Sequence, residues 1–269
     1  MVDSILKKFE ENYAHDLIIA IYGDDSKLYA EDFFVTDRML HKYHNHIVRN
    51  LSHIKGKNIL SIGSHTGWLE VLALLNGAES VTCIEPRKKF AEGLKKFTDQ
   101  HQLKISTICD YHTAVFEIGK KFDTIFAFNS IGMSYDWITY FGRLKTIANK
   151  LIFVKGLSNE LPEDTCKIVR KHNNHHWGGL NIYSTKPQYQ NEYNTETTID
   201  DYISDTRKNS VNFLIGKGFI ENLCLSFGYK ILETWEDKEK KLSPGSSFIE
   251  ESKFYRGDRY FVIDMDTNA

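Results

Sequence analysis

The sequence has no surplus of positive charge. Its 34 Lys and Arg residues stand against 36 Asp and Glu residues, and the formal net charge is −2 with a pI near 6.6. Proteins that hold nucleic acid without regard to sequence neutralise its phosphates with clustered Lys and Arg side chains. The charge balance therefore gives no general attraction to nucleic acid, and it disfavours nucleic acid as the partner.

A long apolar run is also missing. A membrane-spanning helix needs about 20 mostly apolar residues, whereas the longest apolar run near the N-terminus covers only residues 17–22. Charged residues begin at Asp3, which is not typical of a signal peptide. We therefore expect no membrane partner and a cytoplasmic protein.

Closely spaced cysteine pairs are absent. The four cysteines are far apart and form no CxxC motif: Cys83, Cys109, Cys166 and Cys224. This spacing is more typical of reduced thiols in a reducing compartment than of disulfides or metal ligands. Cys83 and Cys109 lie in apolar, strand-like runs, so we expect both thiols to be buried.

What the sequence does contain is enough apolar material for a large core. Of its 269 residues 41% are hydrophobic and 13% aromatic, which excludes a mainly disordered chain. Apolar side chains recur at helical spacing over residues 3–21 and 37–54. We expect residues 1–55 to form an N-terminal helical cap.

From Asn58 onward, short apolar runs alternate with segments of helical spacing. The expected strands cover residues 58–62, 80–84, 104–109, 122–128 and 151–154, and the expected helices 68–75, 87–100, 111–118 and 134–148. This alternation predicts βαβ units and a parallel sheet. Residues 56–269 are then one α/β domain.

The alternation stops over residues 157–206, which are polar and rich in Tyr, so we expect an insertion at the edge of the sheet. Helical spacing returns over residues 211–227. Two strand-like runs follow at 229–235 and 259–265, with no convincing helix between them. Without a helical crossover, these two strands should pair antiparallel.

The segment most indicative of a ligand is a glycine turn between the first strand and its helix. It comprises Gly63, Ser64, His65, Thr66 and Gly67. Such a turn brings backbone N–H groups and the positive end of a helix close to a bound molecule. We expect the absence of a side chain at Gly67 to permit that close approach.

Polar residues end the next three strands. Glu85, followed by Pro86, lies 22 residues after Gly63, a spacing that suits a carboxylate bound to the two ribose hydroxyls of an adenosine-type cofactor. Asp110 and Tyr111 end the third strand, where an adenine would lie, and Asn129 ends the fourth. Open parallel sheets bind ligands at these carboxyl ends.

With these residues the chain resembles the class I S-adenosylmethionine-dependent methyltransferases. Their loop commonly reads acidic-x-Gly-x-Gly-x-Gly, and here it runs from Ser61 through Gly63 and His65 to Gly67. The resemblance covers residues 56–156 and 210–266. It implies a doubly wound α/β fold with a seven-stranded mixed sheet whose last strand is antiparallel and lies beside the fifth. It also implies S-adenosylmethionine as cofactor, with Glu85 at the ribose and Asp110 at the adenine.

Three features depart from the family pattern. Ser61 replaces an acid that normally helps to hold the methionine end of the cofactor, and His65 replaces the middle glycine. No Asn/Asp-Pro-Pro-Tyr motif follows the fourth strand, which argues against the amino-methylating nucleic-acid enzymes that carry it.

Candidate catalytic groups lie in the insertion. An oxygen acceptor of high pKa usually needs a base, and His is the common choice; His175 and His176 are the candidates, with His172 nearby. A solvated or capping histidine cluster is the alternative. Metal ligation by these histidines with Glu160, Glu163 or Asp164, or by the three histidines at 41, 44 and 46, is a weaker alternative, and we expect no metal.

The insertion carries eight Asp and Glu residues against four Lys and Arg residues. This excess suits a neutral or cationic small molecule better than a phosphate backbone, and tyrosine rings could pack on a sugar. The basic run from Arg87 to Lys89 is interpreted as the solvated face of one helix.

These observations predict methyl transfer from S-adenosylmethionine to a small-molecule or saccharide-like acceptor. The alternatives are a degenerate methyltransferase fold that binds a partner protein, an NAD(P)-dependent oxidoreductase, and a tRNA methyltransferase. The loop lacks GxGxxG spacing, which counts against the oxidoreductase. The N-terminal helices could form the interface of a homo-oligomer.

Overall fold

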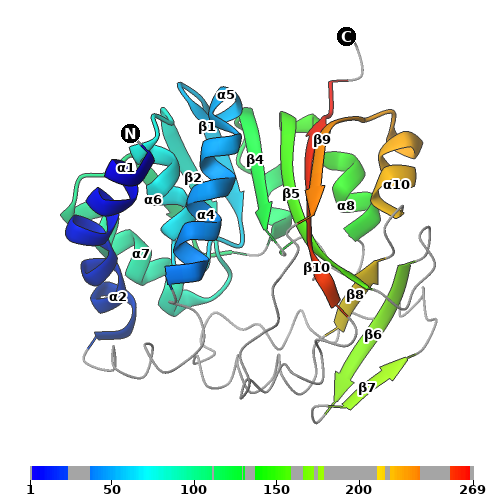
Figure 1. Cartoon of the computed structure of the whole chain (residues 1–269), viewed down its shortest axis with the longest axis horizontal. Helices are drawn as coiled ribbons and strands as arrows, with labels where there is room; N and C mark the ends of the chain where they lie inside the picture. The colour runs from blue at the N-terminus through cyan, green and yellow to red at the C-terminus, as the bar shows by residue number, and fades with distance from the viewer. Residues whose placement is uncertain are drawn as a thin grey trace. The chain divides into compact units, whose positions relative to one another are not determined.

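The structure is a computed structural model that describes residues 2–23, 37–110, 112–128, 130, 137–158, 166–172, 175–178, 211–215, 219–236 and 255–266. Tyr111, Asn129 and most of the insertion expected at 157–206 lie outside these residues. The described chain divides into two compact units, one up to Phe126 and one from Ala127 onward (Figure 1). The predicted division at residue 56 stays a prediction.

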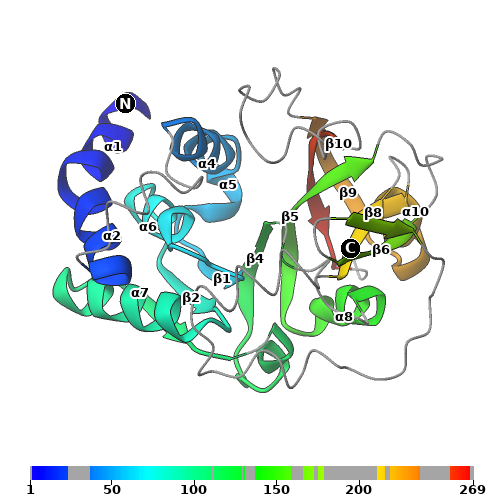
Figure 2. The ribbon, with the colours of Figure 1, turned by 90° about the horizontal axis from the view of Figure 1, so that it is seen from below.

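The first unit begins with two helical runs. One helical run comprises α1 (Val2–Phe9), a π-helical stretch (Glu10–Ala14) and α2 (His15–Tyr22). A second comprises α4 (Asp37–Arg49) and α5 (Leu51–Ile54), separated at Asn50. The predicted helices at 3–21 and 37–54 are therefore confirmed, the second with a break. Figure 2 shows α1 and α2 beside α6 and α7, against which they pack.

Four parallel strands follow in this unit, in the order β3-β2-β1-β4. They are β1 (Asn58–Ile62), β2 (Ser80–Ile84), β3 (Ile105–Ile108) and β4 (Phe122–Phe128), which continues into the second unit. The intervening helices are α6 (Trp68–Leu75), α7 (Lys88–Gln100) and a 3₁₀ turn (His112–Phe116). The sequence predicts β1, β2, β4 and α6 with these bounds.

Strand register aligns the carboxyl ends of β1, β2 and β3. Ile62 lies opposite Ile84, and Ile84 lies opposite Ile108. The Gly63 N–H then donates to the Ile84 carbonyl at 2.8 Å, and the Glu85 N–H donates to the Ile108 carbonyl at 3.1 Å. The residues that immediately follow the three strands are therefore brought to one edge of the sheet.

The second unit contains α8 (Trp137–Arg143), a 3₁₀ turn (Leu144–Thr146), β5 (Ala148–Ser158), α10 (Phe219–Phe227), β9 (Lys230–Glu236) and β10 (Tyr255–Asp264). β10 pairs antiparallel with β5 on one side and with β9 on the other. The predicted antiparallel pairing of the last two strands is thus confirmed.

Three further strands of this unit extend its sheet. β6 (Cys166–His172) and β7 (His175–Gly178) form an antiparallel pair, and β8 (Val211–Ile215) pairs antiparallel with β6 and parallel with β5. The prediction of helical structure from residue 211 was wrong for β8 and correct for α10. A short apolar run such as residues 211–215 fits a strand and a helix equally well until its pairing partners are known.

The seven strands β1–β5, β9 and β10 make the expected mixed α/β sheet, in which the last strand is antiparallel. The parallel strands β1, β2 and β4 are mostly buried, as in sheets covered on both faces, whereas β3 buries only Ile105. The predicted doubly wound fold class is confirmed. Among the residues that the structure describes, no helix combines the length and apolarity that crossing a bilayer requires.

Candidate functional site

The glycine turn between β1 and α6 has three residues in the left-handed region of backbone conformation. Gly63, His65 and Gly67 have φ angles of 74°, 51° and 80°. The Gly67 N–H donates to the Ser64 carbonyl at 3.0 Å, and α6 begins at the next residue. A Cβ at Gly67 would lie 2.4 Å from Leu94 Cδ1. A glycine therefore suits both the positive φ at this position and the close approach of Leu94 of α7, in addition to the ligand approach that the sequence suggested.

His65 occupies the middle-glycine position and adopts a glycine-like conformation there. Its ring lies on the Phe90 ring, with 4.5 Å between the ring centroids and 35° between the planes. Burial and the nearby Arg87 charge hold the pKa of His65 well below its ordinary value of 6.5. The imidazole is therefore neutral at pH 7 and does not repel the guanidinium beside it.

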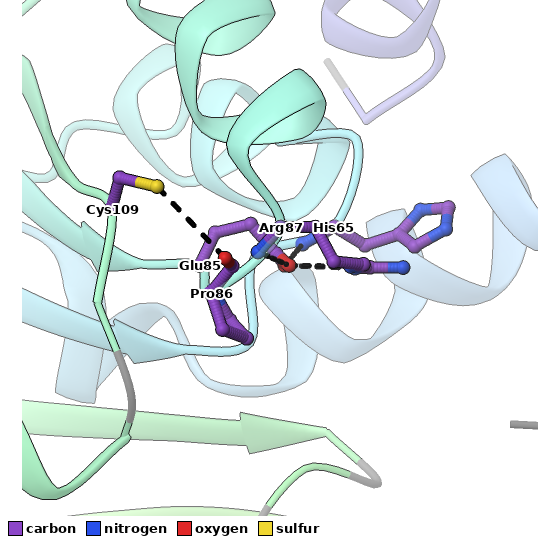
Figure 3. Close-up of polar contacts among 5 residues, drawn as sticks. All are labelled: His65, Glu85, Pro86, Arg87 and Cys109. Atoms are coloured by element: carbon purple, nitrogen blue, oxygen red, sulfur yellow. Dashed lines mark hydrogen bonds and ion pairs between the residues drawn. The ribbon is translucent and has the colours of Figure 1, made fainter. Parts of the chain in front are cut away.

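Glu85 follows β2 and holds a carboxylate that is almost completely buried, with 1% of its side chain exposed. Oε2 accepts from the His65 N–H at 2.8 Å and from Arg87 Nη2 at 2.8 Å. Oε1 accepts from the Arg87 N–H at 3.1 Å and from Arg87 Nε at 2.5 Å (Figure 3). Two backbone donors and a bidentate guanidinium thus surround a single carboxylate.

Arg87 contradicts one interpretation of the sequence. Only 15% of its side chain is exposed, and its guanidinium carbon lies 4.1 Å from the centroid of the Phe90 ring. The expected solvated face is wrong for this residue, because Arg87 precedes α7 and its side chain turns back to Glu85. Lys88, the next residue, is exposed and pairs with Glu92 at 3.9 Å.

The third strand end completes this edge. Asp110 is exposed two residues after β3, and Cys109 lies between the strand and Asp110. Cys109 Sγ approaches the Pro86 carbonyl at 3.9 Å, a long contact for a thiol donor. The predicted burial is confirmed for Cys83 and is wrong for Cys109, which is exposed because β3 ends at Ile108. Gly63–Gly67, Glu85, Pro86 and Asp110 therefore lie at one edge of the sheet, and their contacts with a cofactor stay a prediction.

A second buried carboxyl lies beneath the glycine turn, and the sequence interpretation missed it. Ser61 Oγ donates a short hydrogen bond to Glu70 Oε1, and no described residue forms a hydrogen bond with the buried Glu70 Oε2. Glu70 is fully buried in the first turn of α6. Burial raises the pKa of Glu70 to about 7, although the Ser61 hydrogen bond opposes the shift. The only signal in the sequence was a single acid within an otherwise apolar helix.

The histidines proposed as bases are found in β7 of the second unit. His175 lies opposite His172 in β6, and His176 lies opposite Lys171. Their role as general bases stays a prediction, and so do the cofactor contacts of Tyr111 and Asn129. Among the described residues, no three metal-ligating side chains gather at one place.

No protein-family model matches this sequence, and no curated protein matches it. Solved structures do match. A methyltransferase from Clostridium acetobutylicum, described as S-adenosylmethionine-dependent, has 11% identity and a TM-score of 0.52, over 89% of this chain and 95% of that one. A second, from Mesorhizobium loti and described in the same way, has 12% identity and a TM-score of 0.52, over 82% and 96% of the two chains.

Magnesium protoporphyrin IX methyltransferase from Synechocystis, crystallised with S-adenosylhomocysteine, has 12% identity and a TM-score of 0.51, over 98% and 99% of the chains. At these identities the likeness concerns the fold. The chain has the fold of the class I S-adenosylmethionine-dependent methyltransferases, so the resemblance noted in the sequence is confirmed at the level of the fold.

Proposed function

We propose that this protein is an enzyme that transfers the methyl group of S-adenosylmethionine to a small-molecule or saccharide-like acceptor. The observation that carries the proposal is the buried Glu85 carboxylate at the end of β2, next to the glycine turn. In a parallel sheet this position faces the ribose of a nucleotide-type ligand. S-adenosylmethionine would supply the methyl group, already activated by its sulfonium.

The chain's own residues would bind and orient this cofactor. Glu85 would accept hydrogen bonds from the ribose hydroxyls, the residues from Gly63 to Gly67 would line its backbone side, and Asp110 with Tyr111 would hold the adenine. Asn129 would lie near the reactive end. Methyl transfer needs mainly alignment of donor and acceptor, and an acceptor hydroxyl would need a base such as His175 or His176.

The acceptor class is proposed from charge and composition. Residues 157–206 carry an excess of acidic side chains and several tyrosines, which suits a neutral or cationic small molecule or a sugar. The net charge of −2 disfavours a tRNA substrate. We propose a cytoplasmic protein on the basis of the cysteine pattern, and a homo-oligomer through the N-terminal helices, which sedimentation would test.

One observation favours a second candidate function. All the lone-pair sites of Glu85 are occupied by the protein's own donors, as expected of a degenerate fold that binds a partner protein instead of a cofactor. An oxidoreductase has less support, because β10 lies antiparallel between β5 and β9 and the turn lacks GxGxxG spacing.

Calorimetry with S-adenosylmethionine, S-adenosylhomocysteine, NAD and NADP tests the proposal. We expect micromolar affinity for the two sulfur compounds and a loss of about 100-fold in Glu85→Ala, since two hydrogen bonds to a charged group disappear. Glu79→Ala is the matched control, because Glu79 is an exposed acid just before β2 that pairs with Lys104 at 2.8 Å.

The result decides between the classes. Binding of the sulfur compounds that Glu79→Ala retains and Glu85→Ala loses supports the proposal, and transfer of a labelled methyl group to a panel of small hydroxylated and amino acceptors then identifies the substrate. Binding of NAD or NADP in their place overturns it in favour of an oxidoreductase. Binding of none of the four overturns it in favour of the partner protein.

A further inference from the structure

We infer that Arg87 is an internal ligand of Glu85 that the ribose must displace, so that Arg87 sets the affinity of this site for adenosyl compounds. The inference rests on the proposed function, because it concerns the ribose contact of the same cofactor. It identifies a residue that weakens binding, within a site whose other named residues strengthen it.

Glu85 can accept only a limited number of hydrogen bonds. An ionised carboxylate offers about four lone-pair sites. The structure fills four: two from backbone N–H groups, of His65 and Arg87, and two from the Arg87 guanidinium. A vicinal diol brings two further donors, and Glu85 can accept them only if two existing donors leave.

The donors differ in how easily they can leave. The His65 N–H is fixed by the left-handed conformation of the glycine turn, and the Arg87 N–H is fixed where the chain enters α7. Nε and Nη2 stand at the end of a flexible side chain. The side chain of Arg87 is therefore the group that a ribose would displace.

The geometry of the guanidinium matches the group that would replace it. Its two N–H donors engage the two different oxygens of Glu85, at 2.5 Å and 2.8 Å. The two hydroxyls of a ribose can also place one donor on each oxygen. In this exchange both carboxylate oxygens keep a partner, and the guanidinium, which lies over Phe90, is released to water.

The exchange lowers the apparent affinity, because only the molecules in which the Arg87 guanidinium has left Glu85 can accept the ribose. When only a fraction of molecules can accept a ligand, the apparent dissociation constant is the intrinsic constant divided by that fraction. Minor states of about 10% or less are common for such equilibria. Removal of the guanidinium should therefore tighten binding by about tenfold or more.

The experiment is a calorimetric titration of wild type and three variants with S-adenosylhomocysteine and with adenosine. We expect Arg87→Ala to bind both ligands about tenfold more tightly. The affinity of Arg87→Lys should lie between those of wild type and Arg87→Ala, because an ammonium group cannot form two parallel hydrogen bonds to the carboxylate as a guanidinium does. Lys88→Ala removes the same charge one residue later without touching Glu85, and its affinity should stay within about twofold of wild type.

Adenosine distinguishes the ribose contact from the rest of the cofactor. It carries the ribose but no amino-acid portion, so an equal gain for both ligands supports displacement at Glu85. A gain for S-adenosylhomocysteine alone overturns the inference, as does equal or weaker binding by Arg87→Ala. In those cases wild-type binding still supports the proposed function, whereas absence of binding by all four proteins overturns both.

Arg87→Ala leaves the buried Glu85 charge with its two backbone donors only, so thermal unfolding of each variant is measured alongside. Where Arg87→Ala does not fold, Arg87→Lys provides the test: a few-fold gain in affinity supports the inference, and no gain overturns it.

Discussion

Two buried carboxyls flank the glycine turn, and they differ in what surrounds them. Glu85, at the outer edge, is held by a guanidinium and two backbone N–H groups. Glu70, beneath the turn, accepts a hydrogen bond from the Ser61 hydroxyl, and no described residue forms one with its Oε2 atom. Both side chains are almost inaccessible to water. Equal burial therefore accompanies very different electrostatic support.

The contrast shows what burial does to an acid when its partners are few. Without a nearby cation, desolvation dominates and raises the pKa of Glu70 to about 7. Glu85 is instead held by an ion pair with Arg87, which also occupies the carboxylate. The outer acid thus has its hydrogen-bonding sites filled, whereas the inner acid changes protonation near neutral pH.

The largest expected effect comes from the same substitution made at both acids. Glu85→Gln should lower the free energy of unfolding at pH 7 by about 4 kcal/mol, because it leaves the Arg87 charge facing an amide. Glu70→Gln should cause no such loss at pH 7, because it removes no ion pair and keeps the site uncharged, as the protonated acid does. Urea unfolding measures both, and equal losses would contradict the comparison.

A pH series should show the second effect. Because the folded pKa of Glu70, about 7, exceeds its ordinary value of 4.5, the folded state binds more protons than the unfolded state between these pH values. Stability therefore falls as pH rises through this window and levels off above it, by up to about 3 kcal/mol in total. Glu70→Gln lacks this slope. The test is the difference in unfolding free energy between wild type and variant from pH 4.5 to 8, and a flat difference would contradict it.

Removal of the inner hydroxyl should have a smaller effect. Ser61→Ala deprives Glu70 of its hydrogen bond, and we expect a loss of about 1.5 kcal/mol at pH 8 and less at pH 5, where the carboxyl is protonated. Ser80→Ala is the control, because Ser80 Oγ donates to the neutral Asn58 Oδ1 at 2.7 Å. The loss of stability in Ser80→Ala should not vary over this pH range. The same pH dependence in both variants would therefore refute the role of the Ser61 hydroxyl at Glu70.

The smallest effect is expected at His65. A glycine there relieves the left-handed conformation, worth about 1 kcal/mol, but loses the stacking on Phe90, worth about as much. The free energy of unfolding of His65→Gly, measured in urea, should therefore stay within about 0.5 kcal/mol of the wild-type value. Gln102→Gly isolates the backbone gain, since Gln102 has a φ of 50° and is exposed. A large loss at His65 alone would show that the ring contributes more than its stacking.

Much of the fold could be predicted because local pattern and global structure agree in the first unit. Strands such as Asn58–Ile62 and Ser80–Ile84 are apolar runs bounded by turn residues, and their bounds match the prediction. β6 carries Lys167, Arg170 and Lys171, so its run is not apolar and it escaped detection. Its pairing with β7 and β8 depends on partners distant in the sequence, which periodicity does not register.

The candidate site was predictable in its position but not in its side-chain contacts. The glycine turn and Glu85 are fixed by spacing, because each strand end is followed at once by its polar residue. Arg87 was assigned to a solvated face since a charge run usually marks one, and only the entry into α7 shows that its side chain turns inward. The burial of Glu70 could not be predicted, because the sequence does not show that every side of the first turn of α6 is covered.

The ring of Phe90 connects α2, one of the N-terminal helices, with this edge of the sheet. Tyr22 of α2 meets Phe90 edge-on, with 5.9 Å between the centroids, and the same ring also contacts His65 and Arg87. A ligand that displaces Arg87 from Glu85 changes one contact of the Phe90 ring, which α2 also contacts. Coupling of this kind is reciprocal. If an occupied site changes the affinity of α2 for another molecule by some factor, binding of that molecule to α2 changes the affinity of the site by the same factor.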